Sequence, residues 1–353
     1  MNRNSARLSL YLTLLSVITV AAVVLRTLAC VRDLESNMIY YSSGALITAA
    51  NVVITAGVVL MLTSLVTLRK EPIRASFSSP LTYVPTGVIA TALLLFLIRV
   101  LNSFGEVNTL INATPGNAGA PLQFSKYLLL ACLLLVPIAI AHFFFTAFLT
   151  ERHERLRGWF ALGTILLFAA YAAYLYFNTD APLNSQNKVV EQMSFLFAAL
   201  FFLYETRISL GREMWRPYAA FGLSAAALCA YASVPALLAY LINGRIVTES
   251  IESAVLLFAL FIFIFARLCM CAASAPDREC EEMAALRGFA ERRSAALSTE
   301  IIEDGTQISI EDLMDLGPTD EPHGDDGEAT EEVLLPVETP EIDATTIDGA
   351  ITE

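Results

Sequence analysis

Two glutamates bracket one apolar segment of this chain, and their carboxylates are its strongest candidates for chemistry. The uninterrupted apolar stretch between them, 195–204, is too short to cross a bilayer, so a spanning helix must take in Glu191 or Glu205. The two lie about four helical turns apart, which puts Glu191, Ser194 and Glu205 on one helix face. Charges at membrane depth usually face protein or a water-filled cavity. We therefore predict that this face points inward and lines any polar pathway.

His142 is the deepest titratable side chain outside that segment, and it follows Pro137 by little more than a helical turn. A single histidine in an apolar helix can carry protons, or it can hydrogen-bond only to pack, and both interpretations stay open. The glutamates have an alternative of the same kind, in which they lie at the two interfaces of a tilted helix. We include His142 with Glu191, Ser194 and Glu205 as the candidate polar pathway.

Metal and enzyme chemistry are not indicated. The chain has only three histidines, and the pattern Cys269-x-Cys271 has none nearby, so we expect no metal and no cofactor. There is no G-x-S-x-G, H-E-x-x-H or phosphate-loop motif, so we expect no enzymatic activity. Arg99 and Arg267 lie near the ends of apolar segments, where long cationic side chains can snorkel to the interface.

Apolar segments make up most of the chain and must position these groups. Hydrophobic residues are 56% of the sequence and charged residues 16%, against about 25% charged in soluble domains. The sequence predicts an all-α integral membrane protein, with a transmembrane domain over 1–275 made of about eight helices in four hairpins. The longest outer loop, 104–123, is expected to be a flexible surface segment. The predicted spans are 8–28, 43–67, 84–103, 127–149, 159–178, 189–209, 217–242 and 251–273.

Basic residues predict the orientation. The segments on one side of the spans carry eleven Lys/Arg and those on the other side four, so the first set and both termini are expected in the cytoplasm, with the protein in the plasma membrane. An alternative stays open, in which Thr27–Cys30 is a lipoprotein cleavage box, Cys30 is an external N-terminus and seven spans remain. Two cytoplasmic loops, 67–77 and 150–160, share the pattern T-x-R-basic-E-x-x-R-x-x-F. Either positive-inside selection or duplication of a hairpin explains it.

The C-terminal part differs from the rest. Residues 276–298 are predicted to form a juxtamembrane amphipathic helix. From residue 299 onward the chain has 18 Asp/Glu and no Lys/Arg, which predicts a disordered acidic tail and argues against nucleic-acid binding. Ile310, Leu313 and Met314 form an apolar cluster behind the helix-capping residue Ser309, typical of a segment that folds into a partner's groove. A tail that only solubilises is the alternative.

Two functions of different class follow. One is a non-enzymatic scaffold or signalling protein that docks a cytosolic partner through its tail. The other is a small-solute transporter or permease that uses the face carrying Glu191 and Glu205. The sequence favours the first, because coupled transport usually needs buried charges and the helix centres lack them. Its surroundings are the lipid bilayer, and its oligomeric state is not indicated.

Overall fold

The computed structural model describes residues 3–34, 41–68, 83–113, 119–148, 154–178, 185–209 and 214–273. Within these ranges the chain is helical apart from short connections and forms no β-strand. Eight of the helices are long and apolar enough to cross a membrane. The all-α multi-pass bundle predicted from the spacing of apolar segments is therefore confirmed.

The helices follow one another with short connections. A π-helical turn, Ala29–Asp33, extends the first helix, and the short α3 directly follows α2. Pro137 and Pro235 lie inside α5 and α8. The elements are α1 (Arg3–Leu28), α2 (Gly44–Leu62), α3 (Ser64–Thr67), α4 (Tyr83–Ala113), α5 (Ala120–Phe148), α6 (Glu154–Phe177), α7 (Gln186–Ser209), α8 (Trp215–Asn243) and α9 (Ile251–Ala273).

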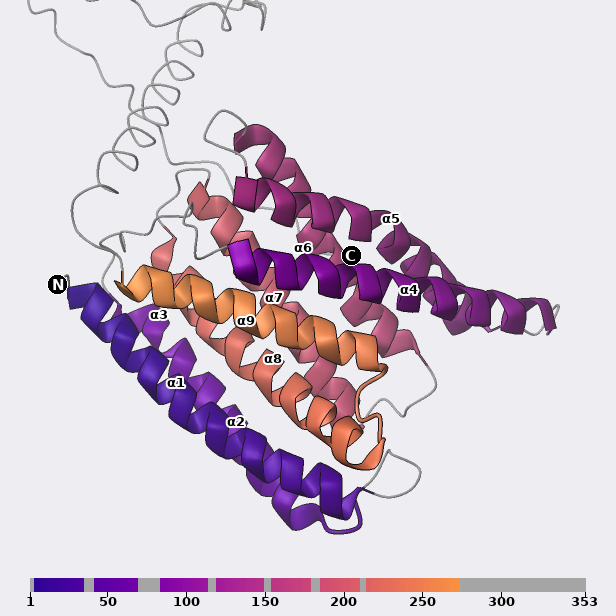
Figure 1. Cartoon of the computed structure of the whole chain (residues 1–353), viewed down its shortest axis with the longest axis horizontal. Coiled ribbons are helices and arrows are strands. Elements are labelled where there is room, and N and C mark those ends of the chain that lie inside the picture. The colour runs from indigo at the N-terminus through magenta and orange to yellow at the C-terminus, as the bar shows by residue number, and fades with distance from the viewer. Residues whose placement is uncertain are drawn as a thin grey trace, which may run out of the picture. The chain divides into compact units, whose positions relative to one another are not determined.

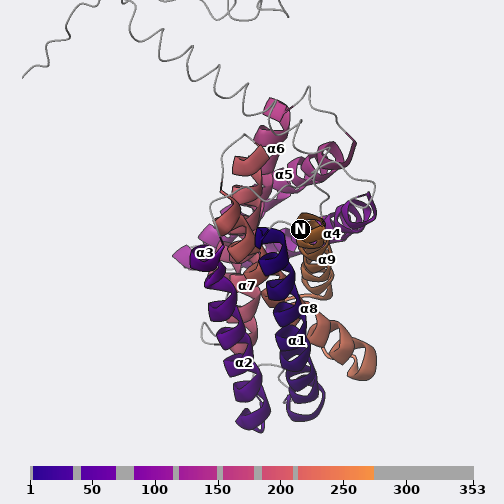
Figure 2. The same cartoon turned by 90° about the vertical axis from the view of Figure 1, so that its left-hand side faces the viewer.

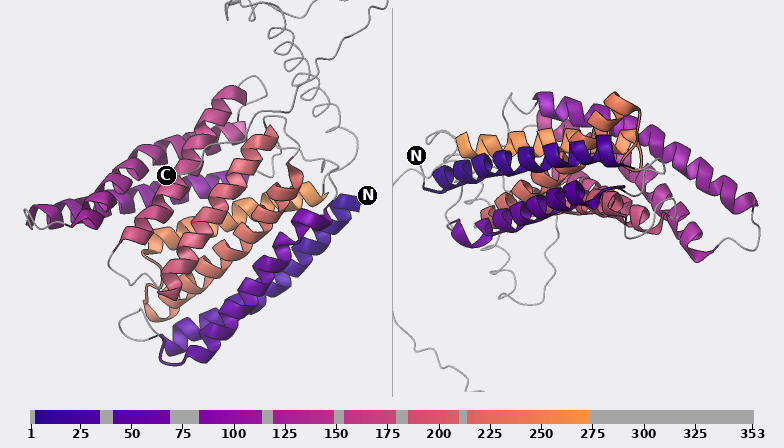
Figure 3. Two further views of the ribbon diagram at one scale, coloured as in Figure 1. Left: turned by 180° about the vertical axis from the view of Figure 1, so that it is seen from behind. Right: turned by 90° about the horizontal axis from the view of Figure 1, so that it is seen from below.

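Six helices form a closed circuit. Each helix from α4 to α9 packs on the next in sequence, and α9 packs back on α4 (Figure 1). The hairpin of α1 and α2 lies outside this circuit, against α8 (Figures 2 and 3). α8 is the most deeply enclosed span, with 67% of its most apolar window buried. Its many small residues allow this, because α1, α2, α7 and α9 can all approach its backbone closely.

Aromatic rings fill the space inside the circuit, and we call them the aromatic core. Phe202 of α7 lies 5.5 Å from Phe143 of α5 and 5.8 Å from Phe263 of α9, measured between ring centroids. Edge-to-face and tilted contacts of this kind stabilise beyond the area they bury. The aromatic core consists of Phe96, Phe143, Phe168, Tyr171, Phe195, Phe202 and Phe263, all at most 1% exposed.

The fourth and fifth helices are longer than the sequence indicated. The prediction of a flexible loop at 104–123 is wrong for most of that range, because α4 continues to Ala113 and α5 begins at Ala120. Phe104, Val107 and Ile111 recur at helical spacing and pack against the core. Lys126 of α5 donates to Asn108 Oδ1 of α4 at 2.8 Å. Pairing of the two helices therefore keeps this polar stretch helical.

Several predicted features lie outside the described residues. They are residues 69–77 and 150–153 of the two similar cytoplasmic loops, the juxtamembrane segment 276–298 and the tail 299–353 with its cluster Ile310, Leu313 and Met314. The rest of the second loop, from residue 154, belongs to α6. These stay predictions.

Candidate functional site

α7 carries the predicted polar face into the interior of the bundle. Glu191 is 1% exposed, Ser194 0% and Glu205 5%. Ser194 donates to Val190 O within its own helix, so it needs no partner elsewhere. Helical spacing places all three on the side of α7 that packs against the other helices. Their role as a pathway stays a prediction.

Glu205 forms an ion pair with Arg267 of α9, which we call the inner ion pair. Arg267 donates to Glu205 Oε1 from Nε at 2.8 Å and from Nη2 at 2.5 Å. Arg267 is 2% exposed, so the expectation that it snorkels to the interface is wrong. A charge removed from both water and headgroups needs a partner, and Glu205 supplies it.

His142 is part of the packed interior. Its Nδ1 lies 3.0 Å from Thr164 Oγ1, which joins α5 to α6. Its ring meets the Phe202 ring edge-on at 6.1 Å, beside the aromatic core. The structure therefore gives the packing interpretation a concrete partner and leaves proton transfer untested.

A second group of charges, which we call the outer cluster, surrounds Glu191. It consists of Glu191, Glu249, Arg99 and Tyr171 from four parts of the chain. Glu249 donates its backbone N–H to Glu191 Oε2 at 2.9 Å. Its own carboxylate accepts from Arg99 Nη2 at 2.8 Å and from the Tyr171 hydroxyl at 3.0 Å. Arg99 is therefore held inside the bundle by Glu249, which the sequence analysis did not identify.

The connection between α8 and α9 positions Glu249. Gly244 ends α8 with φ 65°, a left-handed conformation that glycine adopts without strain, and its N–H bonds Tyr240 O at 2.8 Å. Ser250 caps α9 by accepting from the Ser253 N–H at 3.1 Å. The Glu249 side chain is only 9% exposed as a result. A glycine after one span and a capping serine before the next were the signals that could have located this buried turn.

Arg26 of α1 is a buried cation that sequence analysis did not consider functional. It is 1% exposed and its guanidinium lies 4.5 Å from the centre of the Tyr231 ring. Its Nη2 donates to Asn187 Oδ1 at 3.1 Å, and the Tyr41 hydroxyl donates to the same oxygen at 2.8 Å. Burial raises the pKa of Tyr41, which lies between α1 and α2, so this phenol stays protonated and remains a donor.

Polar side chains next to Arg26 tie three helices together. Tyr231 of α8 donates to Asn51 Oδ1 of α2 at 2.7 Å, and Asn51 Nδ2 donates to Gln186 Oε1 of α7 at 3.2 Å. Asn51 thus joins α2 to α8 and α7 by hydrogen bonds. Arg26, Asn187 and their neighbours thus form a polar region on the same end of α7 as the outer cluster.

The aromatic core separates the two charged regions along α7. Ala198, midway between Glu191 and Glu205, is 0% exposed, as is Phe202. An ionic cluster therefore stands at each end of one packed, water-excluding helix face.

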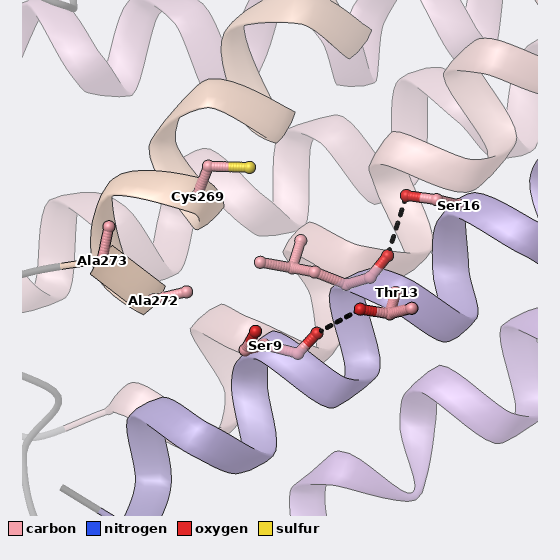
Figure 4. A pocket seen from close by; sticks show the side chains of 7 residues that line it. Ser9, Thr13, Ser16, Cys269, Ala272 and Ala273 are labelled. Atoms are coloured by element: carbon pink, nitrogen blue, oxygen red, sulfur yellow. Dashed lines mark hydrogen bonds between the residues drawn. The ribbon is translucent and has the colours of Figure 1, made fainter. Parts of the chain in front are cut away.

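A groove between α1 and α9 is lined by none of these charged side chains (Figure 4). It has a volume of about 340 Å³ and is lined by Ser9, Thr13, Ser16 and Cys269 among others. Thr13 and Ser16 donate to carbonyls of their own helix, as the dashed lines show, so these hydroxyls can face lipid. Among the described residues no three His, Cys, Asp or Glu side chains come together as a metal site.

No protein-family model, curated protein or solved structure matches this chain. Any function must therefore be argued from the residues of the chain itself.

Proposed function

We propose that this multi-pass membrane protein moves a small solute across the bilayer along the inward face of α7, and that it is not an enzyme. The observation that supports this best is the pair of buried charged groups at the two ends of that face, with the aromatic core between them. Ionisable groups inside a membrane bundle are costly, and they usually mark a pathway for ions or substrates. The sequence alone favours a scaffold, because the centres of the predicted helices carry no charges.

In this proposal the two ionic groups act as gates. The inner ion pair joins α7 to α9, while Arg99, Glu249 and Tyr171 join α4, the α8–α9 turn and α6. Separation of either set exposes one end of the α7 face to water while the other end stays closed. The distribution of Lys and Arg favours a plasma-membrane protein with both termini cytoplasmic, so the inner ion pair faces the cytoplasm.

Cysteine labelling tests the pathway. Ala198→Cys, in a background with the six native cysteines replaced, is expected to resist a membrane-impermeant maleimide in the closed state, because the residue is fully buried. Adding Glu249→Gln weakens the outer cluster, so we expect severalfold faster labelling from outside. Adding Glu205→Gln weakens the inner ion pair, so we expect faster labelling from the cytoplasm.

Leu196→Cys is the matched control, because Leu196 lies two residues away on the exposed side of α7, with 41% of its surface exposed. A side chain that faces lipid should react no faster in any of these backgrounds. Labelling of position 198 that never changes, or that rises equally from both sides, would contradict a gated pathway.

The acidic tail supports a second candidate function, docking of a cytosolic partner. Its specific motivation is the capped cluster of Ile310, Leu313 and Met314 within an otherwise charged segment. A segment this short is not a stable helix alone, so it must fold when it binds the partner. The free-energy cost of that folding weakens binding, and we expect a dissociation constant on the order of micromolar.

Replacing Leu313 and Met314 together by Ala is expected to abolish recovery of the partner while leaving membrane insertion unchanged, because the pair supplies most of the apolar face. The measurement is the set of cytosolic proteins that co-purify with the full-length chain and not with a chain ending at residue 298. Recovery of the same proteins by the double variant would show that the tail docks elsewhere or only solubilises.

A further inference from the structure

Arg26 and Asn187 leave several buried donors without acceptors. Arg26 Nε, Arg26 Nη1 and Asn187 Nδ2 are inaccessible to solvent and have no hydrogen-bond partner among the described residues. Buried polar atoms are nearly always paired, so each such atom needs an explanation. Here three unpaired atoms come from two side chains that are already in contact, Nη2 to Oδ1 at 3.1 Å.

The unpaired atoms have one chemical character. Guanidinium and amide nitrogens donate and cannot accept. The one charge among them is positive, and among the described residues no carboxylate oxygen lies within 4.0 Å of Arg26. The groups around its guanidinium are the Tyr231 ring, Asn187, the Tyr41 hydroxyl and the Cys30 thiol, and Glu191 is a charged side chain that acts on it from a greater distance. A buried cation without a counter-ion is strongly unfavourable. The missing group is therefore an acceptor that also carries negative charge.

We propose that Arg26 and Asn187 bind a small anion, chloride or the carboxylate of a small organic acid. A water molecule satisfies some donors but leaves the charge uncompensated, whereas an anion does both. The Tyr41 hydroxyl and Tyr231 ring fix the orientation of Asn187 and Arg26, so the site is held ready from α1, α7, α8 and the α1–α2 connection. This site deepens the proposed function. The further step, that the bound anion is the transported solute, rests on that proposed function.

Glu191 is the internal competitor for this role. It lies one turn from Asn187 on α7, and its Oε1 is also buried and unpaired. Glu191 Oε2, however, is occupied by the backbone N–H of Glu249. The test must therefore separate an external anion from a carboxylate of the protein.

Thermal unfolding of the full-length protein in lipid nanodiscs measures binding without transport. Sodium chloride and sodium acetate are compared with sodium gluconate, a bulky anion, at equal ionic strength. Because only the folded state offers the site, the unfolding midpoint of the wild type is expected to rise with the logarithm of chloride or acetate concentration. A response to chloride alone identifies an inorganic-anion site, and a response to acetate identifies a carboxylate site.

Two variants make the result specific. Arg26→Gln removes the positive charge and is expected to abolish the anion response. Asn187→Asp places a carboxylate beside Arg26, so the midpoint should rise without added anion and then depend on anions no longer. Arg245→Gln is the matched control, because Arg245 is another arginine of this end of the bundle, bonded to Leu34 O at 2.8 Å, and its loss should leave the response intact.

A midpoint that follows ionic strength alone, or an anion response that survives in Asn187→Asp, would overturn the proposal. So would an anion-independent wild type in which Glu191→Gln and Arg26→Gln each lower the midpoint as much as the two together, since Glu191 would then be the counter-ion. If the anion response holds but position 198 never becomes accessible, the site binds an anion for structural reasons and only the transport proposal fails.

Discussion

Arg267→Ala is expected to destabilise the folded protein by about 3–5 kcal/mol, because it leaves Glu205 buried and without its counter-ion. Both side chains of the inner ion pair are almost completely enclosed, at 3% and 6% exposure. Lipid offers Glu205 no replacement donor, so the carboxylate is left buried and uncompensated. The measurement is reversible unfolding in mixed micelles with increasing SDS.

The double variant Glu205→Leu with Arg267→Met separates the attraction within the ion pair from the cost of burying its two charges. Apolar side chains of similar size often replace a buried ion pair at little cost, so the double variant should recover most of the loss. Arg207→Ala is the surface control, since Arg207 lies near Glu205 on α7 but is half-buried and contacts the Met214 sulfur at 3.6 Å. If Arg267→Ala lowers the free energy of unfolding no more than Arg207→Ala does, the inner ion pair does not stabilise the bundle.

Apolar length predicted the helices well, and the reason is physical. A backbone N–H or C=O group in lipid has no water to bond, so it must find its hydrogen-bond partner within the protein. A long apolar segment meets this requirement by forming a helix, and the chain has eight such segments. The inward face of α7 was predictable for the same reason, because its apolar run was too short to hide Glu191 and Glu205. The largest errors are at the adjoining ends of α4 and α5, where pairing between the two helices outweighs a polar composition.

The partners of the buried charges were not predictable from spacing alone. Glu205 and Arg267 are far apart in the chain, and only the packing of α7 on α9 brings them together. Arg26 is a single charge within an apolar segment, and only the packing of α8 on α1 shows that the Tyr231 ring covers it. Sequence patterns show which side of a helix is polar, but they do not show which helix faces it.

Arg99 contacts two carboxylates, which allows a direct comparison of a buried and an exposed partner. Its guanidinium lies 2.8 Å from Glu249 and 3.8 Å from Glu106, whose side chains are 9% and 64% exposed. Exposed pairs contribute about 0–1 kcal/mol, because water and salt screen them and two long side chains must be ordered. A charge-assisted hydrogen bond to a buried carboxylate is worth about 1.5–3 kcal/mol.

Glu249→Gln is therefore expected to lower the free energy of unfolding by about 2–3 kcal/mol, while Glu106→Gln changes it by less than about 1 kcal/mol. Glu249 also bonds the Tyr171 hydroxyl at 3.0 Å, so its loss disturbs α6 as well as α4. Unfolding of both variants under the same conditions, with Arg99→Gln as a third, makes the comparison. Glu249 lies on the turn between α8 and α9. If Glu249→Gln and Glu106→Gln lower the free energy of unfolding equally, this turn does not close the outer end of the bundle.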